Sequence, residues 1–403
     1  MTHRSPAAHL GAIAAFCAGL ASTAAMADSL KIGAVFPLSG TYGSYGKGLS
    51  AALTIALDQI NAAGGVAGAP VELIIEDDQT DPTAGLNAAK KVVEVNGASA
   101  IVATFATSVT LPILSYTTQV GVPVATVAGA PEITQMGQDT GLVYRFVYTE
   151  ARFGEAMATY ARKAGFSRAY VLNANNAALL ASGESFEKRF TAEGGEVLGL
   201  TAFEPGQPSY RSELTKALAD EPEIVFLSAY TNDAITLAKA LYQLSPETRV
   251  IGPLYSLGTD FIAAVGPEVS EGALAVDPVS AVDSAAYKTF APLYTSATGD
   301  DPLGNPYAVM AYDQLVTFAL AAEAAKSTDG KVYAPFVATV ANAPGEKVSS
   351  YAEGLAALNE GKDIDYDGAS SPVDFEGPDL AAMYMQTYVI EGGQIIAKDT
   401  LAP

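Results

Sequence analysis

Short apolar runs alternate with helical apolar spacing along almost the whole chain after residue 28. Residues 30–36 are apolar apart from Lys31, which is typical of a buried strand, and Leu49, Leu53, Leu57 and Ile60 then recur every three or four positions. A second mostly apolar stretch follows at 71–75, where Glu72 is the exception, ahead of the next helical pattern. Because strands that alternate with helices pair in parallel beneath a helical cover, this pattern predicts an α/β fold.

The alternation restarts after Tyr148, which predicts a second α/β unit. Strands are expected there at 169–173, 197–203, 224–227, 250–251 and 273–277, with helices between them. Helical spacing then dominates 285–341, and 383–397 has the pattern of a hairpin. The chain thus returns to each unit, which predicts one lobe from 28–147 plus 277–380 and another from 148–276 plus 381–403.

The first 27 residues have the pattern of a secretion signal. Arg4 precedes an apolar run at 10–20, and Ala25-Met26-Ala27 matches the small-x-small site of a signal peptidase. We predict cleavage after Ala27 and release into the periplasm. A lipid anchor on Cys17 is not expected, because Phe16 occupies the position where a lipobox has a small residue.

Removal of that leader also removes several kinds of chemistry. Both histidines, His3 and His9, and the only cysteine, Cys17, lie within it, and the chain has no tryptophan. The remaining chain cannot form a Ser-His-Asp triad, a cysteine nucleophile, a thiolate zinc site or a disulfide. Carboxylate pairs such as Asp77-Asp78 remain, and glycosidases use two carboxylates, but this pair lies in a turn before a helix. We predict no enzyme activity, no metal and no cofactor.

The net charge limits the partners. It is −22 for the full sequence, and −23 once the leader's Arg4 is gone. A surface this acidic repels nucleic acid and anionic lipid, whose binding depends on Lys and Arg. It also keeps a protein soluble, so we expect a monomer without nucleic-acid partners.

A series of short motifs resembles the exported binding proteins of the branched-chain amino-acid family. They occur in the family's order and spacing at 31–40, 45–46, 58–66, 77–82, 105–108, 130–132, 144–145, 271–272 and 312–313. The resemblance implies a type I periplasmic binding fold, with two doubly wound lobes joined by three crossovers and a ligand held between them. It also implies the permease and ATPase of an ABC importer as partners. The alternative is a sensor that presents the same domain to a receptor or kinase.

The resemblance also implies where a ligand is held. Residues 105–110 run from a strand end into a helix start, so free N–H groups there can hold a carboxylate, and Thr107 matches a family residue that does so. Thr107 and Ser108 could instead cap the helix. The expected contacts are Tyr45, Phe105, Thr107, Ser108, Ala128, Gly129, Ala130, Tyr148, Leu180, Tyr230, Leu254 and Tyr255.

The second lobe departs from the amino-acid binders in its cleft, where an aromatic residue before Gly183-Glu184 is missing and a glutamate is replaced. Leu254 stands where those proteins have a glutamate that pairs with the ligand's ammonium group. Because an unpaired buried ammonium is costly, the departure favours a small aromatic or aliphatic acid over an amino acid. Asp233 or Asp277 could supply the missing charge from another direction.

Overall fold

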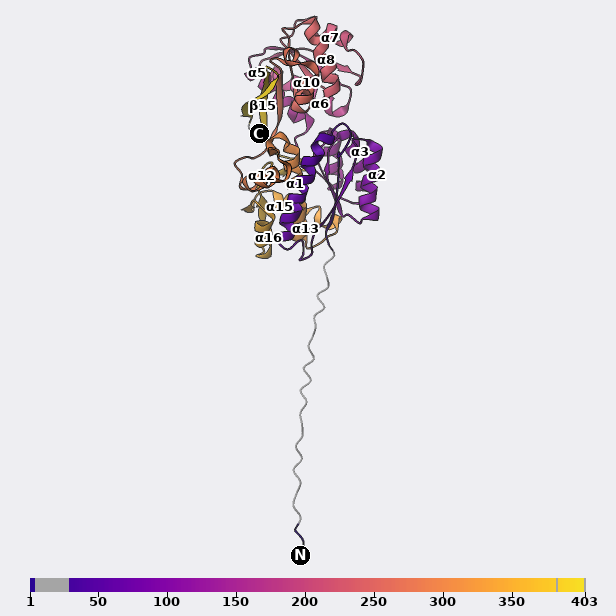
Figure 1. Cartoon of the computed structure of the whole chain (residues 1–403), viewed down its shortest axis with the longest axis vertical. Coiled ribbons are helices and arrows are strands. Elements are labelled where there is room, and N and C mark those ends of the chain that lie inside the picture. Colours follow the sequence, from indigo (N-terminus) through magenta and orange to yellow (C-terminus); the bar gives the residue numbers. More distant parts are fainter. Residues whose placement is uncertain (4–28, 382, 402–403) are drawn as a thin grey trace.

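The computed structural model describes residues 1–3, 29–381 and 383–401, and it has two lobes stacked along the long axis of the molecule (Figure 1). Most of the predicted leader, including Cys17 and the cleavage site after Ala27, lies outside the described residues.

The first lobe is built on a seven-stranded sheet in the order β13-β14-β5-β4-β3-β1-β2. Neighbouring strands among β1 to β5, and also β14 with β5, pair in parallel, while β13 pairs antiparallel with β14. The strands are β1 (Lys31–Phe36), β2 (Glu72–Asp77), β3 (Ala100–Thr104), β4 (Val124–Thr126), β5 (Val143–Arg145), β13 (Phe375–Glu376) and β14 (Asp379–Leu380). Its first helices are α1 (Gly43–Ala62), α2 (Pro82–Lys90), the π-helical turn η1 (Lys91–Val95), α3 (Thr107–Val120) and α4 (Pro131–Thr140).

Later segments complete this lobe. They are α12 (Ala285–Thr298), η2 (Pro302–Gly304), α13 (Pro306–Ala325), α14 (Gly330–Tyr333), α15 (Phe336–Ala341), β11 (Glu346–Val348), α16 (Tyr351–Asn359) and β12 (Ile364–Tyr366). Helix α13 is the centre of the lobe's core, since it packs against α1, α15 and α16 and is buried from Pro306 to Ala322. Among the described helices, none is both long and apolar enough to cross a membrane.

The second lobe has its own seven-stranded sheet in the order β16-β15-β10-β9-β8-β6-β7. Its strands are β6 (Arg168–Ala174), β7 (Glu196–Phe203), β8 (Ile224–Ser228), β9 (Arg249–Pro253), β10 (Leu274–Val279), β15 (Tyr384–Glu391) and β16 (Gln394–Leu401). Its helices are α5 (Glu150–Lys163), α6 (Ala177–Ala192), α7 (Arg211–Ala217), α8 (Thr231–Leu244), α9 (Leu254–Leu257), α10 (Thr259–Val265) and α11 (Pro267–Ser270). The C-terminal hairpin is β15 and β16, which continue the sheet antiparallel to β10.

Three crossovers join the lobes. The chain passes from β5 to α5, from β10 to α12, and from β14 to β15. The two-lobed, doubly wound α/β fold with three crossovers is therefore confirmed. Strand β10 continues in the second sheet to Val279, three residues beyond the predicted boundary after residue 276.

Helix α6 begins earlier than its apolar spacing indicates. A helix is expected at 184–192, yet α6 begins at Ala177, because the Asn176 side chain accepts a hydrogen bond from the Leu179 N–H and caps it. Gly183 then lies inside the helix, where an added Cβ would lie 2.1 Å from the Asn173 side chain. Gly183 is therefore needed for the close packing of α6 on β6, although in the sequence it stands just before the predicted start of the helix.

Candidate ligand-binding site

A cavity of about 460 Å³ lies between the lobes, where the carboxyl ends of strands and the N-terminal ends of helices from both sheets meet. Ligands of open α/β sheets bind at this edge. The cavity is lined by Thr41, Tyr42, Tyr45, Thr80, Phe105, Ala106, Thr107, Ser108, Leu111, Val127, Ala128, Gly129, Ala130, Glu132, Glu150, Asn176, Ala177, Ala178, Tyr230, Tyr255 and Tyr307.

The start of α3 presents unused hydrogen-bond donors to the cavity. Ala106 is the N-cap, and no side chain caps this helix. Within the described residues, the N–H groups of Thr107 and Ser108 donate no hydrogen bond. Their hydroxyls are therefore not used as caps, and the helix end, with its partial positive charge, suits a carboxylate.

The loop between β4 and α4 adds donors from a second helix start. Ala128, Gly129 and Ala130 are buried, and the N–H groups of Gly129 and Ala130 have no partner among the described residues. The Gly129 carbonyl, by contrast, accepts from the Glu150 N–H at 3.2 Å and from Arg145 Nη1 at 3.1 Å. A Cβ on Gly129 would lie 2.6 Å from Glu150 Cγ, so this approach needs glycine.

Buried Arg145 holds that loop in place. Its Nε lies 2.9 Å from Asp379 Oδ1, and its Nη2 donates to Thr134 Oγ1 at 2.7 Å. The Thr134 hydroxyl in turn donates to Asp379 Oδ2 at 2.8 Å. Arg145 therefore links β5, the ligand-facing loop, α4 and the segment before the third crossover.

Aromatic rings form much of the remaining wall. Phe105 lies 5.0 Å from Tyr45 and 5.1 Å from Tyr307, measured between ring centroids, and 5.5 Å from Tyr42. From the second lobe, Tyr255 lies 6.2 Å from Tyr230. Such a wall suits an aromatic or hydrocarbon body, or a cation held against ring faces.

Glu150, the first residue of α5, is a cavity-lining acid that faces these rings. The Tyr255 hydroxyl donates to its carboxylate, with the phenol oxygen 3.2 and 3.3 Å from the two carboxylate oxygens. Burial raises the pKa of Glu150 to about 7, and the Tyr255 hydrogen bond and the positive charge of Arg145 oppose that rise. At neutral pH the group is therefore poised between its neutral and charged forms.

A second acid, Asp277, lies behind the wall on β10. It is buried, and its Oδ1 has no hydrogen-bond partner within the described residues. Burial raises the pKa of Asp277 to about 8; the nearby Tyr307 hydroxyl opposes that rise and the charge of Glu150 adds to it. Asp277 does not line the cavity, and Asp233 is occupied elsewhere by the Gly206 N–H and the Tyr210 hydroxyl.

Most of the residues expected from the sequence meet at this cavity. The structure places Tyr45, Phe105, Thr107, Ser108, Ala128, Gly129, Ala130, Tyr230 and Tyr255 on its wall. Three others lie outside it. Tyr148 is buried in the first crossover, where its hydroxyl accepts a hydrogen bond from the Met383 N–H at 2.7 Å. Leu180 lies in α6, whose first two residues, Ala177 and Ala178, line the cavity in its place. Leu254 packs on the second lobe's core.

Sequence reasoning missed three side chains that shape the site. Tyr42 lies three residues before Tyr45, and Glu150 opens the helix that follows the Tyr144-Arg145 motif, so a search near the matched motifs could have found both. Tyr307 comes from the start of α13, which contacts the other cavity residues only in the folded protein.

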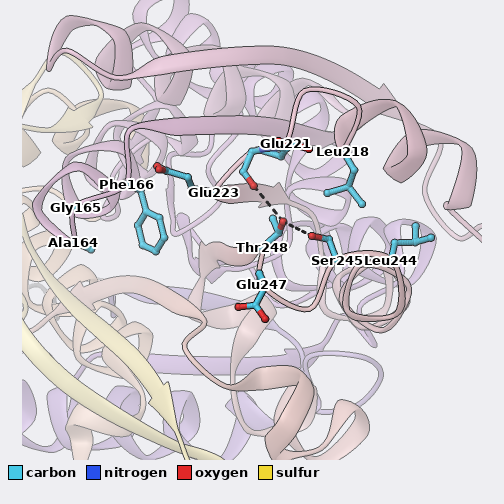
Figure 2. A pocket seen from close by; sticks show the side chains of 11 residues that line it. Ala164, Gly165, Phe166, Leu218, Glu221, Glu223, Leu244, Ser245, Glu247 and Thr248 are labelled. Carbon is cyan, nitrogen blue, oxygen red and sulfur yellow. Dashed lines mark hydrogen bonds between the residues drawn. The ribbon is translucent and has the colours of Figure 1, made fainter.

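A larger hollow of about 650 Å³ lies at the far end of the second lobe, at the amino ends of β8 and β9 (Figure 2). Its polar groups bond to one another: Ser245 and Thr248 hydroxyls lie 2.9 Å apart, and the Glu223 carboxylate accepts from two backbone N–H groups. It offers no converging set of unpaired donors, and we do not assign it a ligand.

A two-lobed α/β clamp with hydrogen-bond donors and aromatic rings in its cleft is the architecture of a solute-binding protein. The family described as periplasmic binding protein matches residues 29–392, and the chain belongs to that family. Family membership makes it a binding protein rather than an enzyme.

Individual relatives agree with this placement. The Leu/Ile/Val-binding protein BraC3 of Rhizobium johnstonii is 27% identical over 377 residues, covering 92% of this chain and 94% of the relative. Among solved structures, a leucine-binding protein from Thermotoga maritima has a TM-score of 0.75 at 20% identity, covering 93% of this chain and 99% of its own. An ABC-transporter solute-binding protein from R. palustris, in complex with benzoate, has a TM-score of 0.69 at 21% identity, covering 93% and 97%. The two solved structures support the fold alone.

Proposed function

We propose that the protein is the solute-binding subunit of an ABC importer, and that its solute carries a carboxylate on an aromatic or aliphatic body. The observation that carries the proposal is the set of unpaired N–H groups at Thr107, Ser108, Gly129 and Ala130, which surround one part of the cavity. Two helix starts supply these donors, so they match the charge and the hydrogen-bonding capacity of a carboxylate.

The rest of the wall sets the body of the solute. Six aromatic residues face the cavity, and its volume lies within the range of ligand pockets, so a solute with a flat or branched hydrocarbon body can be enclosed. Leu254 by itself favours a solute without a free α-ammonium group, but Glu150 places a negative charge on the same wall. Acids without an amine and zwitterions therefore both belong to the proposed class.

The mechanism we propose is capture between open lobes, closure about the three crossovers and delivery of the closed form to a permease with its ATPase. The relative named as a Leu/Ile/Val-binding protein supports a small carboxylate-bearing solute. The site of action would be the periplasm, after cleavage following Ala27.

A carboxylate-deletion experiment tests the proposal. A thermal-shift screen of organic acids, amino acids and betaines finds stabilising solutes, since a ligand of the native state raises its melting temperature. Each hit is then compared by calorimetry with its own primary amide. We expect the acid to bind and the amide to lose at least about tenfold in affinity. Equal affinities, or a screen without any carboxylate hit, would overturn the proposal.

A further inference from the structure

Glu150 is a carboxylate in a cavity that contains no fixed cation. Of the lining residues, only Glu132 and Glu150 are charged, and none is Lys, Arg or His. Arg145 weakens the rise in the pKa of Glu150, but it lies outside the cavity wall, where Asp379, Gly129 and Thr134 use its guanidinium group. The cavity therefore presents a negative charge without a partner inside it.

Aromatic residues line the same cavity as that carboxylate. Tyr255 donates to it directly, and the Tyr230 ring lies 6.2 Å from that of Tyr255. Tyr42 and Tyr307 also line the cavity; burial is the main cause that raises their pKa values, and the charge of Glu150 adds to it. A negative charge in a cavity walled by four tyrosines attracts an organic cation, because ring faces add negative potential of their own.

We propose that Glu150, with Tyr42, Tyr230, Tyr255 and Tyr307, forms a subsite for an alkylated ammonium group. This proposal rests on the proposed function: the carboxylate of the same solute would lie at the donors of Thr107 and Gly129. The solute would thus be a betaine-like zwitterion, with a permanent positive charge at one end and a carboxylate at the other.

The kind of cation follows from the acceptors that the subsite offers. A primary ammonium group has three N–H bonds that each need an acceptor once buried. Here a single carboxylate, already bonded to Tyr255, shares the cavity wall with aromatic rings and their phenol groups. An ammonium group with methyl substituents has no N–H bonds to satisfy, and its methyl groups pack on the rings while its charge is attracted to Glu150.

The subsite also couples binding to proton release. Burial raises the pKa of Glu150 to about 7 and that of Asp277 to about 8, so both groups hold protons in part at neutral pH when no cation is present. A bound cation favours their charged forms, so binding should release protons and tighten as the pH rises towards 8. The titratable and charged groups that interact electrostatically with Glu150 are Tyr42, Tyr230, Tyr255, Tyr307, Asp277 and Arg145, and Glu132 lines the same cavity.

Matched head groups test the proposal. The probes are trimethylammonio-carboxylates with one to four methylene groups, each paired with its neutral tert-butyl isostere and its primary ammonium counterpart. For at least one chain length, we expect the trimethylammonium compound to bind at least about tenfold more tightly than either counterpart, as measured by calorimetry. In Glu150→Gln this preference should disappear. In Glu155→Gln, which changes a half-buried acid on the same helix that does not line the cavity, it should persist.

Proton release gives a second readout, from the same titrations in buffers of different ionisation enthalpy. Release near pH 7 that is clearly smaller in Glu150→Gln than in wild type supports the subsite, since only Asp277 remains to release protons there, and undiminished release contradicts it. If the tert-butyl acids bind as well as the charged compounds, the cation subsite is wrong while the carboxylate proposal stands. If the primary ammonium compounds bind tightest, the subsite does not prefer alkylated cations. If no carboxylate of any series or of the wider screen binds, the proposed function itself fails.

Discussion

Thr107 is the first residue of α3, and its hydroxyl and N–H are both unused by the helix. A hydrogen bond to a charged group contributes about 1.5–3 kcal/mol, so Thr107→Ala should weaken carboxylate binding by about one to two orders of magnitude. Thr107→Ser keeps the hydroxyl and should be much milder. Calorimetry with a solute from the screen measures both, and equal affinity in wild type and Thr107→Ala would place the carboxylate elsewhere.

Asp277 makes a prediction about stability and pH. Its pKa is raised to about 8 in the folded protein from 3.8, so between these values the native state holds a proton that the unfolded chain has released. Its stabilising contribution is complete below about pH 4 and is lost as the pH rises to about 8, with a slope of up to about 1.4 kcal/mol per pH unit.

Asp277→Asn should remove that slope. We expect denaturant unfolding of the ligand-free protein to show a steeper loss of stability from pH 5 to 8 in wild type than in the variant. Asp283→Asn is the control and should follow wild type, because Asp283 is exposed in the connection between β10 and α12. Parallel pH profiles for all three proteins would mean that Asp277 ionises normally.

Arg145 acts at the scale of elements, because it joins β5, the 128–130 loop, α4 and the segment around Asp379. Removing one member of a buried ion pair costs about 3–5 kcal/mol, so Arg145→Met should destabilise the protein by that order. Lys91→Met breaks the exposed pair with Glu76 and should cost less than about 1 kcal/mol. Urea unfolding compares the two variants, and similar losses in the free energy of unfolding would show that the Arg145 network stabilises the fold no more than an exposed ion pair does.

Contact between the lobes belongs to the scale of the whole molecule. Ala178, near the start of α6 in the second lobe, is buried in a cluster with Ala130 and Ile133 of the first lobe. Ala178→Arg places a long charged side chain in that contact and should hold the lobes apart. Ala192→Arg, at the exposed end of the same helix, is the matched control.

Small-angle scattering with and without a solute from the screen measures this closure. Wild type and Ala192→Arg should become more compact when the solute binds, since closure follows capture. Ala178→Arg should remain extended and bind more weakly. If Ala178→Arg closes and binds like wild type, closure does not use this contact.

The sequence by itself determined the architecture and one half of the site. Apolar periodicity predicted the strand and helix alternation, and the motif at 105–108 placed a strand end next to a helix start. The loop at 128–130 was predicted from the family resemblance, and in the structure it lies at the same edge of the sheet as 105–108. These are local features, and each is encoded within about ten consecutive residues.

Only the tertiary structure decided which side chains complete the cavity. Glu150 faces it because the first crossover brings the start of α5 against Gly129, and Tyr307 does so because α13 returns from a distant part of the chain. Leu180 and Leu254 were expected on the wall but lie off it. Leu180 lies in α6, which begins at Ala177 after the Asn176 cap, and Leu254 packs on the second lobe's core. Such placements depend on contacts between residues far apart in sequence, and the local spacing of apolar residues does not specify those contacts.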